Sequence, residues 1–214
     1  MEFSGTDIID LFAAPTTNGL RTKIMLDECA LPYTLHPVDI RSSENKQDWF
    51  VEMNPDGLAP VLIDRDGPGG EPVTLSQSIA ILIYLAEKTG LFVPDEPRQR
   101  AEFWSLLMNA ATDVAPAVVG IFLIQRRSEG PDNGPALKVF EDRFRDFMSV
   151  WDQRLATGKW CAGNEVTIAD FALYPVFVRC RDVVPEITAG LANVDRWCAD
   201  MAKRPGVMKG MTFA

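Results

Sequence analysis

Two hydrogen-bonding side chains, Thr16 and Asn18, lie one residue apart in the segment formed by residues 15–19. The segment separates a short apolar run, residues 8–12, from a helical pattern that starts near Leu20, so it indicates a turn from a strand into a helix. A helix N-terminus carries unpaired N–H groups and about half a positive charge, and it attracts a phosphate, a carboxylate or a thiolate. Thr, Asn and Gly are also typical of a plain helix cap, and by itself the segment fits that interpretation better.

The composition is that of an ordinary soluble globular chain. The 214 residues are 47% apolar and 24% charged, with a net charge of −9. The sequence has no basic face that would indicate nucleic-acid binding, and no apolar run approaches the roughly 20 residues that span a membrane. The polar N-terminus, residues 1–7, does not resemble a secretory signal. We therefore expect a cytoplasmic protein with no nucleic-acid or membrane partner.

Cysteine and histidine usage argues against a metal centre. The four cysteines are far apart and form no Cys-x-x-Cys motif, which predicts reduced, mostly buried thiols rather than a zinc site or a redox pair. They are Cys29, Cys161, Cys180 and Cys198. The single histidine, His36, excludes a His-rich metal site and argues against a Ser-His-Asp triad. We interpret it as a surface residue of a strand.

Hydrophobic periodicity predicts a β-α-β-α-β-β-α order for the first 89 residues. Strand, helix and strand within about 35 residues predict a parallel pair with a right-handed crossover. The turn at residues 64–70 has hairpin length, so the last two strands are expected to be antiparallel. Ser76 is the expected N-cap of the helix that follows. The expected strands are residues 8–12, 33–40, 58–63 and 72–75, and the helices 20–30, 41–53 and 77–88.

The second part of the chain is expected to be helical throughout. Thr167 and Asp170 have the spacing of a capping box, which accounts for Asp170 without a catalytic role. Pro116 predicts a kink in a long helix, and Pro205 is expected to end the last one. A Gly- and Pro-rich loop is expected at residues 128–135. The expected helices are residues 98–127 and 136–155, one that starts near residue 167, and 191–203.

Several motifs spread over nearly the whole chain resemble those of the cytosolic glutathione transferases. They are Ala-Pro-Thr-Thr-Asn-Gly at residues 14–19, Asn-Pro at 54–55 with Ala-Pro-Val-Leu at 59–62, Ser-Gln-Ser-Ile-Ala-Ile at 76–81, and the capping segment at 167–170. The Thr-x-Asn pair is similar to that of the bacterial Nu class and of the fungal nitrogen-regulator-like relatives. Those relatives are associated with glutathione-dependent disulfide reduction as well as transferase activity.

The resemblance implies an α/β plus all-α fold. Residues 1–89 are expected to form a thioredoxin-like glutathione-binding domain, residues 90–97 a linker, and residues 98–214 an all-helical domain. It also implies a homodimer, a cis peptide at Ala59-Pro60, and glutathione as the co-substrate with no metal. The sequence itself indicates only that Pro60 opens a strand.

Glutathione chemistry requires a thiolate, and the reference pKa of a cysteine thiol is about 8.5. An enzyme lowers that pKa by donating hydrogen bonds and positive potential to the sulfur. The Thr16 hydroxyl, the Asn18 amide and the N–H groups that open the first helix are placed to do so. Neither side chain is a base near neutral pH, so their expected role is electrostatic and orienting.

The rest of the glutathione site follows from the resemblance. The backbone of Ala59, before Pro60, is expected to pair with the cysteinyl unit like an added strand. The γ-glutamyl carboxylate is expected at the N-terminus of the third helix, against Gln77 and Ser78, although plain capping also explains these two residues. The family more often has an acid at Gln77, and related members often have a Lys in the stretch that Leu58 occupies.

Three functions remain open at this point. They are a glutathione-dependent disulfide reductase, a transferase that adds glutathione to an electrophile, and a non-catalytic binding or regulatory protein. Residues 112–127 are expected to supply an apolar wall for a second substrate, although most of them also fit an ordinary core. Arg21 and Lys23 are candidates for further anionic contacts, although exposed helix cations are usually only solvated.

Overall fold

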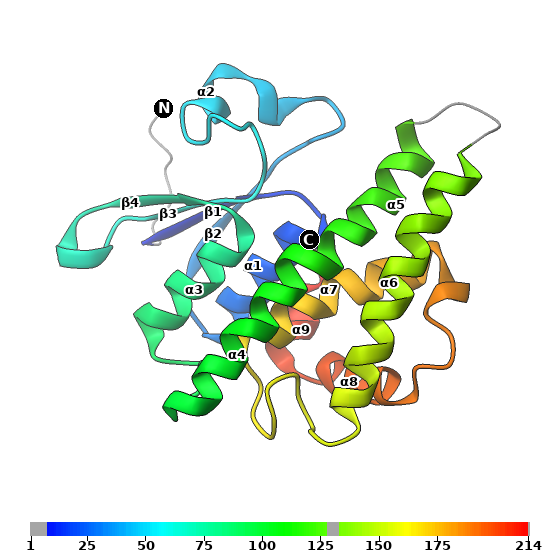
Figure 1. The fold of residues 1–214 in the computed structure, drawn as a ribbon. Helices are drawn as coiled ribbons and strands as arrows, with labels where there is room; N and C mark the ends of the chain where they lie inside the picture. Colours follow the sequence, from blue (N-terminus) through cyan, green and yellow to red (C-terminus); the bar gives the residue numbers. More distant parts are fainter. Residues whose placement is uncertain (1–7, 128–132, 214) are drawn as a thin grey trace. The chain divides into compact units, whose positions relative to one another are not determined.

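The computed structural model describes residues 8–127 and 133–213 (Figure 1). It divides into two compact units, Met1–Leu91 with Arg204–Ala214 and Phe92–Lys203, which we call the first and second units. The first is an α/β unit with a four-stranded sheet and the second is helical, which confirms the predicted fold class. The sequence-based interpretation of residues 1–7, and most of the loop expected at 128–135, lie outside the described residues.

The sheet of the first unit has the strand order β2-β1-β3-β4. Strand β1 pairs in parallel with β2, and β3 pairs antiparallel with β4, as predicted. Strand β1 also pairs antiparallel with β3, which the sequence analysis did not specify. Helices α1 and α3 lie on one face of the sheet and α2 on the other (Figure 1). The strands are β1 (Ile9–Ala13), β2 (Tyr33–Pro37), β3 (Val61–Asp64) and β4 (Val73–Ser76).

The helices of this unit are α1 (Thr17–Glu28), α2 (Asp48–Val51), α3 (Ser78–Thr89) and α9 (Pro205–Gly210), with short 3₁₀ turns at Glu44–Lys46 and Pro68–Gly70. The expected N-cap at Ser76 is wrong, because that residue still belongs to β4 and Gln77 occupies the cap position. Backbone pairing between Ser76 and Val61 extends the strand by one residue beyond the sequence-based limit.

Helix α9 was not predicted, because Pro205 was interpreted as the end of a helix. Proline is equally suited to the first turn of a helix, and here it starts one. The segment packs on α1: Glu28 accepts hydrogen bonds from the Val207 N–H and from Arg204 Nε, both at 3.1 Å. Lys23 Nζ donates to the carbonyl oxygen of Lys209 at 2.8 Å. These contacts assign residues 204–214 to the first unit, whereas the domain bounds expected from the sequence placed them in the helical domain.

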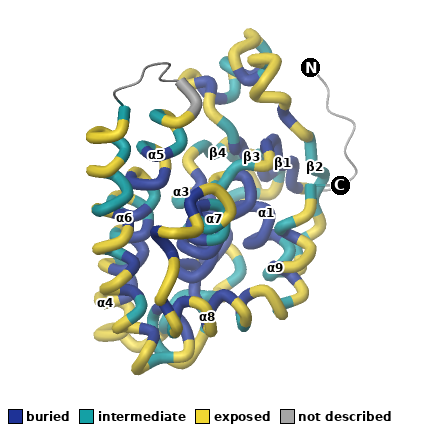
Figure 2. The backbone as a smooth tube through the Cα atoms, turned by 90° about the vertical axis from the view of Figure 1, so that its right-hand side faces the viewer, coloured by how far each residue is buried: buried dark blue, intermediate teal, exposed yellow. Residues whose placement is uncertain are grey.

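The second unit contains α4 (Pro97–Asn109), a π-helical turn (Ala110–Val114), α5 (Ala115–Arg127), α6 (Gly134–Leu155), α7 (Ile168–Val183), a 3₁₀ turn (Pro185–Ile187) and α8 (Ala192–Ala202). The helical run in which a kink is expected at Pro116 contains a π turn just before that residue, consistent with the N–H that proline lacks. Figure 2 shows buried and exposed positions alternating along α6, whose buried residues are Phe144, Met148, Trp151 and Leu155.

In the described ranges one helical run, Pro97–Gln125, is long and apolar enough to cross a membrane by length and composition, which the sequence analysis did not expect. A single run of this kind is weak evidence for a membrane span, because core helices of folded domains share its length and composition. Phe103, Leu107 and Ile121 of this run are fully buried within the helical unit. The run therefore contributes buried side chains to the core of that unit.

Candidate functional site

Thr16 is the N-cap of α1. Its backbone is extended, with φ −107° and ψ 166°, and its Oγ1 accepts the Gly19 N–H at 3.2 Å. The hydroxyl hydrogen is not used by that bond, so Thr16 can cap its helix and still donate to an anion. The first turn of α1 contains no acidic side chain. The positive end of this helix is therefore not neutralised by its own sequence.

Gly19 occupies the third helical position of α1, where a capping box would place its acid. A Cβ at this position would collide with the carbonyl oxygen of Ala14. The close approach of the two backbones therefore excludes a side chain here. As a result, α1 cannot form the self-capping arrangement that an acid at this position provides.

Asn18 is exposed and lies in the first turn of α1. Its Oδ1 accepts from Arg21 Nη1 at 2.8 Å and from Ser78 Oγ at 3.3 Å. A guanidinium only donates, so the atom that faces Arg21 must be the amide oxygen. The Nδ2 group is thereby turned away from these partners and is available as a donor.

Ser78 joins the start of α3 to the start of α1. It is buried, and its hydroxyl accepts from Arg21 Nη1 at 3.3 Å while it donates to Asn18. The two residues are 60 positions apart in the chain. Two helix N-termini thus meet within hydrogen-bond distance, and each supplies unpaired N–H groups.

The register of the sheet brings the remaining predicted residues close to the end of β1, where Thr16 and Asn18 follow. Strand β3 begins at Val61, opposite Phe12 near the end of β1 and opposite Ser76 at the end of β4. The cis peptide Ala59-Pro60, which the resemblance implied, therefore precedes β3 at the edge where β1 and β4 end. The loop after β1, the loop before β3 and the loop after β4 therefore all lie at the same end of the strands.

Gln77 has an unusual backbone for a residue with a side chain. Its φ is 69° and its ψ is 111°, and its exposed side chain makes no capping hydrogen bond. The plain capping interpretation of Gln77 is therefore wrong. An exposed amide beside open helical N–H groups is consistent with ligand contact, and a positive φ outside glycine is a frequent feature of such sites.

Arg21 and Lys23 are buried rather than exposed, contrary to the expectation from sequence. Their exposed fractions are 3% and 5%. Desolvation lowers the pKa of Arg21 to about 10, which still leaves it charged at neutral pH. Lys23 pairs with Asp27 at 3.2 Å, beside the contact with α9. The sequence analysis named Arg21 only as a candidate for anionic contacts and missed its bond to Asn18, although the spacing of three between them on one helix was a usable signal.

His36 lies in β2, as expected, but it is only partly exposed. Its Nε2 is 2.9 Å from Asp10 Oδ1, and its ring stacks on Phe12 with the ring centres 4.4 Å apart. Asp10 is fully buried and also pairs with Arg65. These contacts give His36 a structural explanation.

The cysteines do not offer a protein thiolate. None of the four forms a disulfide, and three are buried, as the sequence predicted. Burial raises the pKa of Cys29 to about 11 and that of Cys180 and Cys198 to about 12, and it also raises the pKa of Cys161. A reactive thiolate would have to come from a ligand. Within the described ranges, no group of three or more His, Cys, Asp or Glu side chains is arranged to hold a metal ion.

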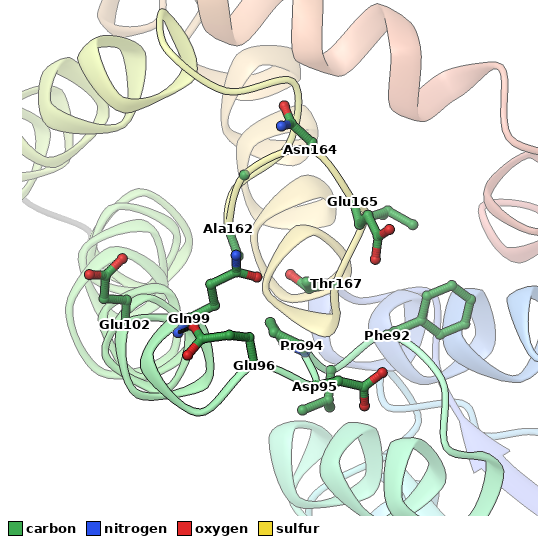
Figure 3. Close-up of a pocket in the computed structure, with 13 residues that line it drawn as sticks. Phe92, Pro94, Asp95, Glu96, Gln99, Glu102, Ala162, Asn164, Glu165 and Thr167 are labelled. Carbon is green, nitrogen blue, oxygen red and sulfur yellow. Dashed lines mark hydrogen bonds between the residues drawn. The ribbon is translucent and has the colours of Figure 1, made fainter.

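A cavity of about 590 Å³ lies in the second unit, between the start of α4 and the loop before α7 (Figure 3). Four of its lining residues are carboxylates, Asp95, Glu96, Glu102 and Glu165. Glu96 is engaged as the N-cap of α4, accepting from the N–H groups of residues 98 and 99. An acidic lining repels a thiolate and the two carboxylates of glutathione. The cavity is therefore not the glutathione site.

Family models match both units of the chain. The glutathione S-transferase N-terminal domain matches residues 17–88, and the C-terminal domain of the same family matches residues 114–200. The disulfide-bond oxidoreductase YfcG of Escherichia coli (strain K12) is 33% identical over 170 residues, which are 78% of each chain. The protein belongs to the glutathione S-transferase family of glutathione-dependent enzymes, and the match to YfcG agrees with the predicted likeness to the Nu class.

Solved structures of related proteins contain glutathione. A glutathione transferase family member from Pseudomonas fluorescens, with two glutathione bound, has a TM-score of 0.89 at 29% identity and covers 98% of this chain and 94% of its own. A glutathione transferase from Pseudomonas putida, with one glutathione disulfide bound per subunit, has a TM-score of 0.90 at 27% identity, with 99% and 94% covered. Both structures share the fold described above.

Proposed function

We propose that the protein reduces disulfides with glutathione, whose thiolate is held by Thr16, Asn18 and the first N–H groups of α1. The observation that carries this proposal is the junction between the starts of α1 and α3. There, Asn18 and Ser78 lie 3.3 Å apart at an acid-free helix N-terminus. The relatives crystallised with two glutathiones or with glutathione disulfide support the same chemistry.

The reaction is a pair of thiol–disulfide exchanges. The bound glutathione thiolate attacks one sulfur of the substrate disulfide, and the other sulfur leaves as a thiolate. A second glutathione thiolate then attacks the glutathione sulfur of the mixed disulfide, so that glutathione disulfide forms and the remaining substrate sulfur leaves as a thiolate. Both reducing electrons come from the two glutathiones, so no protein cysteine is needed.

Each part of glutathione has a proposed partner. The cysteinyl backbone pairs with Ala59 before the cis Pro60, and the sulfur lies against Thr16 and Asn18. The γ-glutamyl carboxylate lies at the start of α3, against Gln77 and Ser78. Leu58 is 54% exposed and offers no charge to the glycyl carboxylate, so we expect weaker binding than in relatives with a Lys there.

A transferase reaction is the second candidate, because it uses the same thiolate. Helix α5 presents Val119 and Leu123, which are 45% and 46% exposed, whereas Val118 and Ile121 are core residues. The exposed pair supports an apolar surface for an electrophile, as residues 112–127 were expected to supply. The homodimer implied by the resemblance and the cytoplasmic location expected from the sequence remain part of the proposal.

The test compares two assays on the same preparation. One follows glutathione-dependent reduction of a small mixed disulfide, and the other follows conjugation of glutathione to chlorodinitrobenzene. We expect fast reduction and slow conjugation, with the reduction lost in Thr16→Ala and Asn18→Ala. Strong conjugation with weak reduction would make the protein a transferase. No turnover in either assay, together with glutathione binding, would make it a binding protein.

A further inference from the structure

We propose that Arg21 is a positioning residue of the glutathione site, whose guanidinium joins Asn18 to Ser78 and fixes the direction in which the Asn18 amide donates. The inference rests on the proposed function, because it concerns the site that holds the thiolate. Arg21 does not touch the sulfur in this account. It acts through Asn18.

Three distances define the bridge. Arg21 Nη1 lies 2.8 Å from Asn18 Oδ1 and 3.3 Å from Ser78 Oγ, and Ser78 Oγ lies 3.3 Å from Asn18 Oδ1. The guanidinium donates to both neighbours, so the serine hydroxyl accepts from Arg21 and directs its own hydrogen to Asn18. The donor and the acceptor are thereby assigned in each of the three hydrogen bonds among Arg21, Asn18 and Ser78, which we call the triangle. The amide of Asn18 is left with one orientation, in which Nδ2 faces out of the triangle.

Without its hydrogen bond from Arg21, which we call the anchor, the Asn18 amide can rotate by half a turn and present its oxygen to the ligand. An amide oxygen next to a thiolate repels it, so the flipped orientation would raise the pKa of the bound thiol. The anchor therefore matters for the sign of the interaction as well as for its strength. A preorganised donor also needs no rearrangement when the charge on sulfur develops.

Burial adds a second effect. Arg21 is 3% exposed, whereas Asn18 is exposed to the ligand side. A charge that water does not surround acts more strongly on its neighbours than a solvated one. Its pKa of about 10 leaves the guanidinium positive throughout the range in which a glutathione thiol titrates. The buried charge therefore favours the thiolate over the thiol.

Lys23 offers a matched control on the same helix. It is also a buried cation, at 5% exposure, but its partners are Asp27 and the carbonyl of Lys209 rather than site residues. Replacing it with Met removes a buried charge two positions away without altering the triangle. A general loss of stability or of helix charge would change both Arg21→Met and Lys23→Met, whereas loss of the anchor would change Arg21→Met alone.

The experiment measures kcat/KM for reduction of a glutathione mixed disulfide from pH 5.5 to about 9 in wild type, Arg21→Met, Arg21→Lys and Lys23→Met. We expect Arg21→Met to raise the pKa of the acidic limb by about one unit and to lower kcat/KM about tenfold at neutral pH. Arg21→Lys keeps the charge but not the rigid fork, so we expect a smaller shift. Lys23→Met is expected to keep the wild-type profile.

An unchanged profile in Arg21→Met, beside the loss of reduction in Asn18→Ala, would overturn the inference and leave the proposed function intact. A wild type that neither binds glutathione nor turns it over would overturn both. Circular dichroism and thermal unfolding check that each variant folds. If Arg21→Met does not fold, the shift in Arg21→Lys relative to Lys23→Met decides, and equal profiles would reject the anchor.

Discussion

Helices α1 and α7 start in the same way and use the start differently. Each is capped by a threonine with an extended backbone, Thr16 with φ −107° and Thr167 with φ −132°. In α7 the third position is Asp170, which completes the predicted capping box, whereas in α1 the third position is Gly19. One helix supplies its own anion, and the other leaves the place of the anion open.

The closed start belongs to the helical unit. Asp170 is fully buried and accepts hydrogen bonds from the N–H groups of Cys161 and Thr167, from the Thr167 hydroxyl, and from Trp197 Nε1 at 2.8 Å. Desolvation raises its pKa, while these donors hold the pKa down. Every donor around this carboxylate is internal, so the arrangement stabilises the fold and presents nothing to a ligand. In this protein, the threonine cap without an acid at the third position leaves its helix N-terminus open to an anion.

The largest expected effect lies at the closed start. Asp170→Ala leaves several buried donors without an acceptor, and we expect the free energy of unfolding to fall by about 3–5 kcal/mol. Urea unfolding followed by tryptophan fluorescence measures it. Asp170→Asn keeps the volume and one acceptor oxygen, and we expect an intermediate loss. A fall below about 1 kcal/mol for Asp170→Ala would show that the box is not a stabilising element.

The corresponding change at the open start should affect activity rather than stability. Thr16→Gly removes the hydroxyl but keeps a residue that caps well, so the free energy of unfolding should change by only a few tenths of a kcal/mol. We expect kcat/KM for disulfide reduction to fall about a hundredfold, because one donor to the thiolate is lost.

Thr16→Ser keeps the hydroxyl and serves as the matched control for this change. Its activity should stay within a few-fold of wild type. A Thr16→Gly variant with full activity would contradict the role of the hydroxyl and return Thr16 to plain capping.

The other end of α1 is covered by α9. A Cβ at Gly210 would lie 2.5 Å from the Ile24 Cα, so Gly210→Ala must push the two helices apart. We expect a loss of about 1–3 kcal/mol in the free energy of unfolding. Gly134→Ala is the control, because a Cβ there meets nothing within 4 Å. Equal stability of the two variants would mean that α9 does not support α1.

The smallest expected effect comes from making α1 resemble α7. Gly19 cannot carry an acid, but Thr17, at the first helical position, is only partly buried and can. Thr17→Glu should stabilise the helix by about 0.3–1 kcal/mol and raise the pKa of the bound glutathione thiol by up to about one unit. Thr17→Gln is the uncharged control. A thiol pKa that is the same in both variants would show that the helix charge does not act on the sulfur.

Local sequence patterns were sufficient for most elements and for the residues at their starts. The order of the elements along the first unit, the antiparallel last pair of strands and the capping box at Thr167 follow from short-range spacing. The meeting of Asn18 with Ser78 did not follow from it, because it depends on the register of β1, β3 and β4. The site residues themselves were reached through the resemblance and remain proposals.

Two features were hidden for physical reasons. A charged residue in a helix is normally exposed, so Arg21 gave no local sign of burial, and its contact with Ser78 depends on the tertiary fold. Helix α9 was hidden because a proline ends one helix and starts another equally well, and its packing on α1 depends on Gly206 and Gly210. Such close approaches are set by the fold.

The central claim is that the open start of α1 holds a thiolate. The most direct measurement is a pH titration of glutathione bound to the wild-type protein, followed by the ultraviolet absorbance of the thiolate and corrected for free glutathione. If the start of α1 stabilises the thiolate, the apparent pKa of the bound thiol is at least one unit below the reference value of about 8.5 for a cysteine thiol. A bound thiol that titrates at the same pH as free glutathione would contradict it.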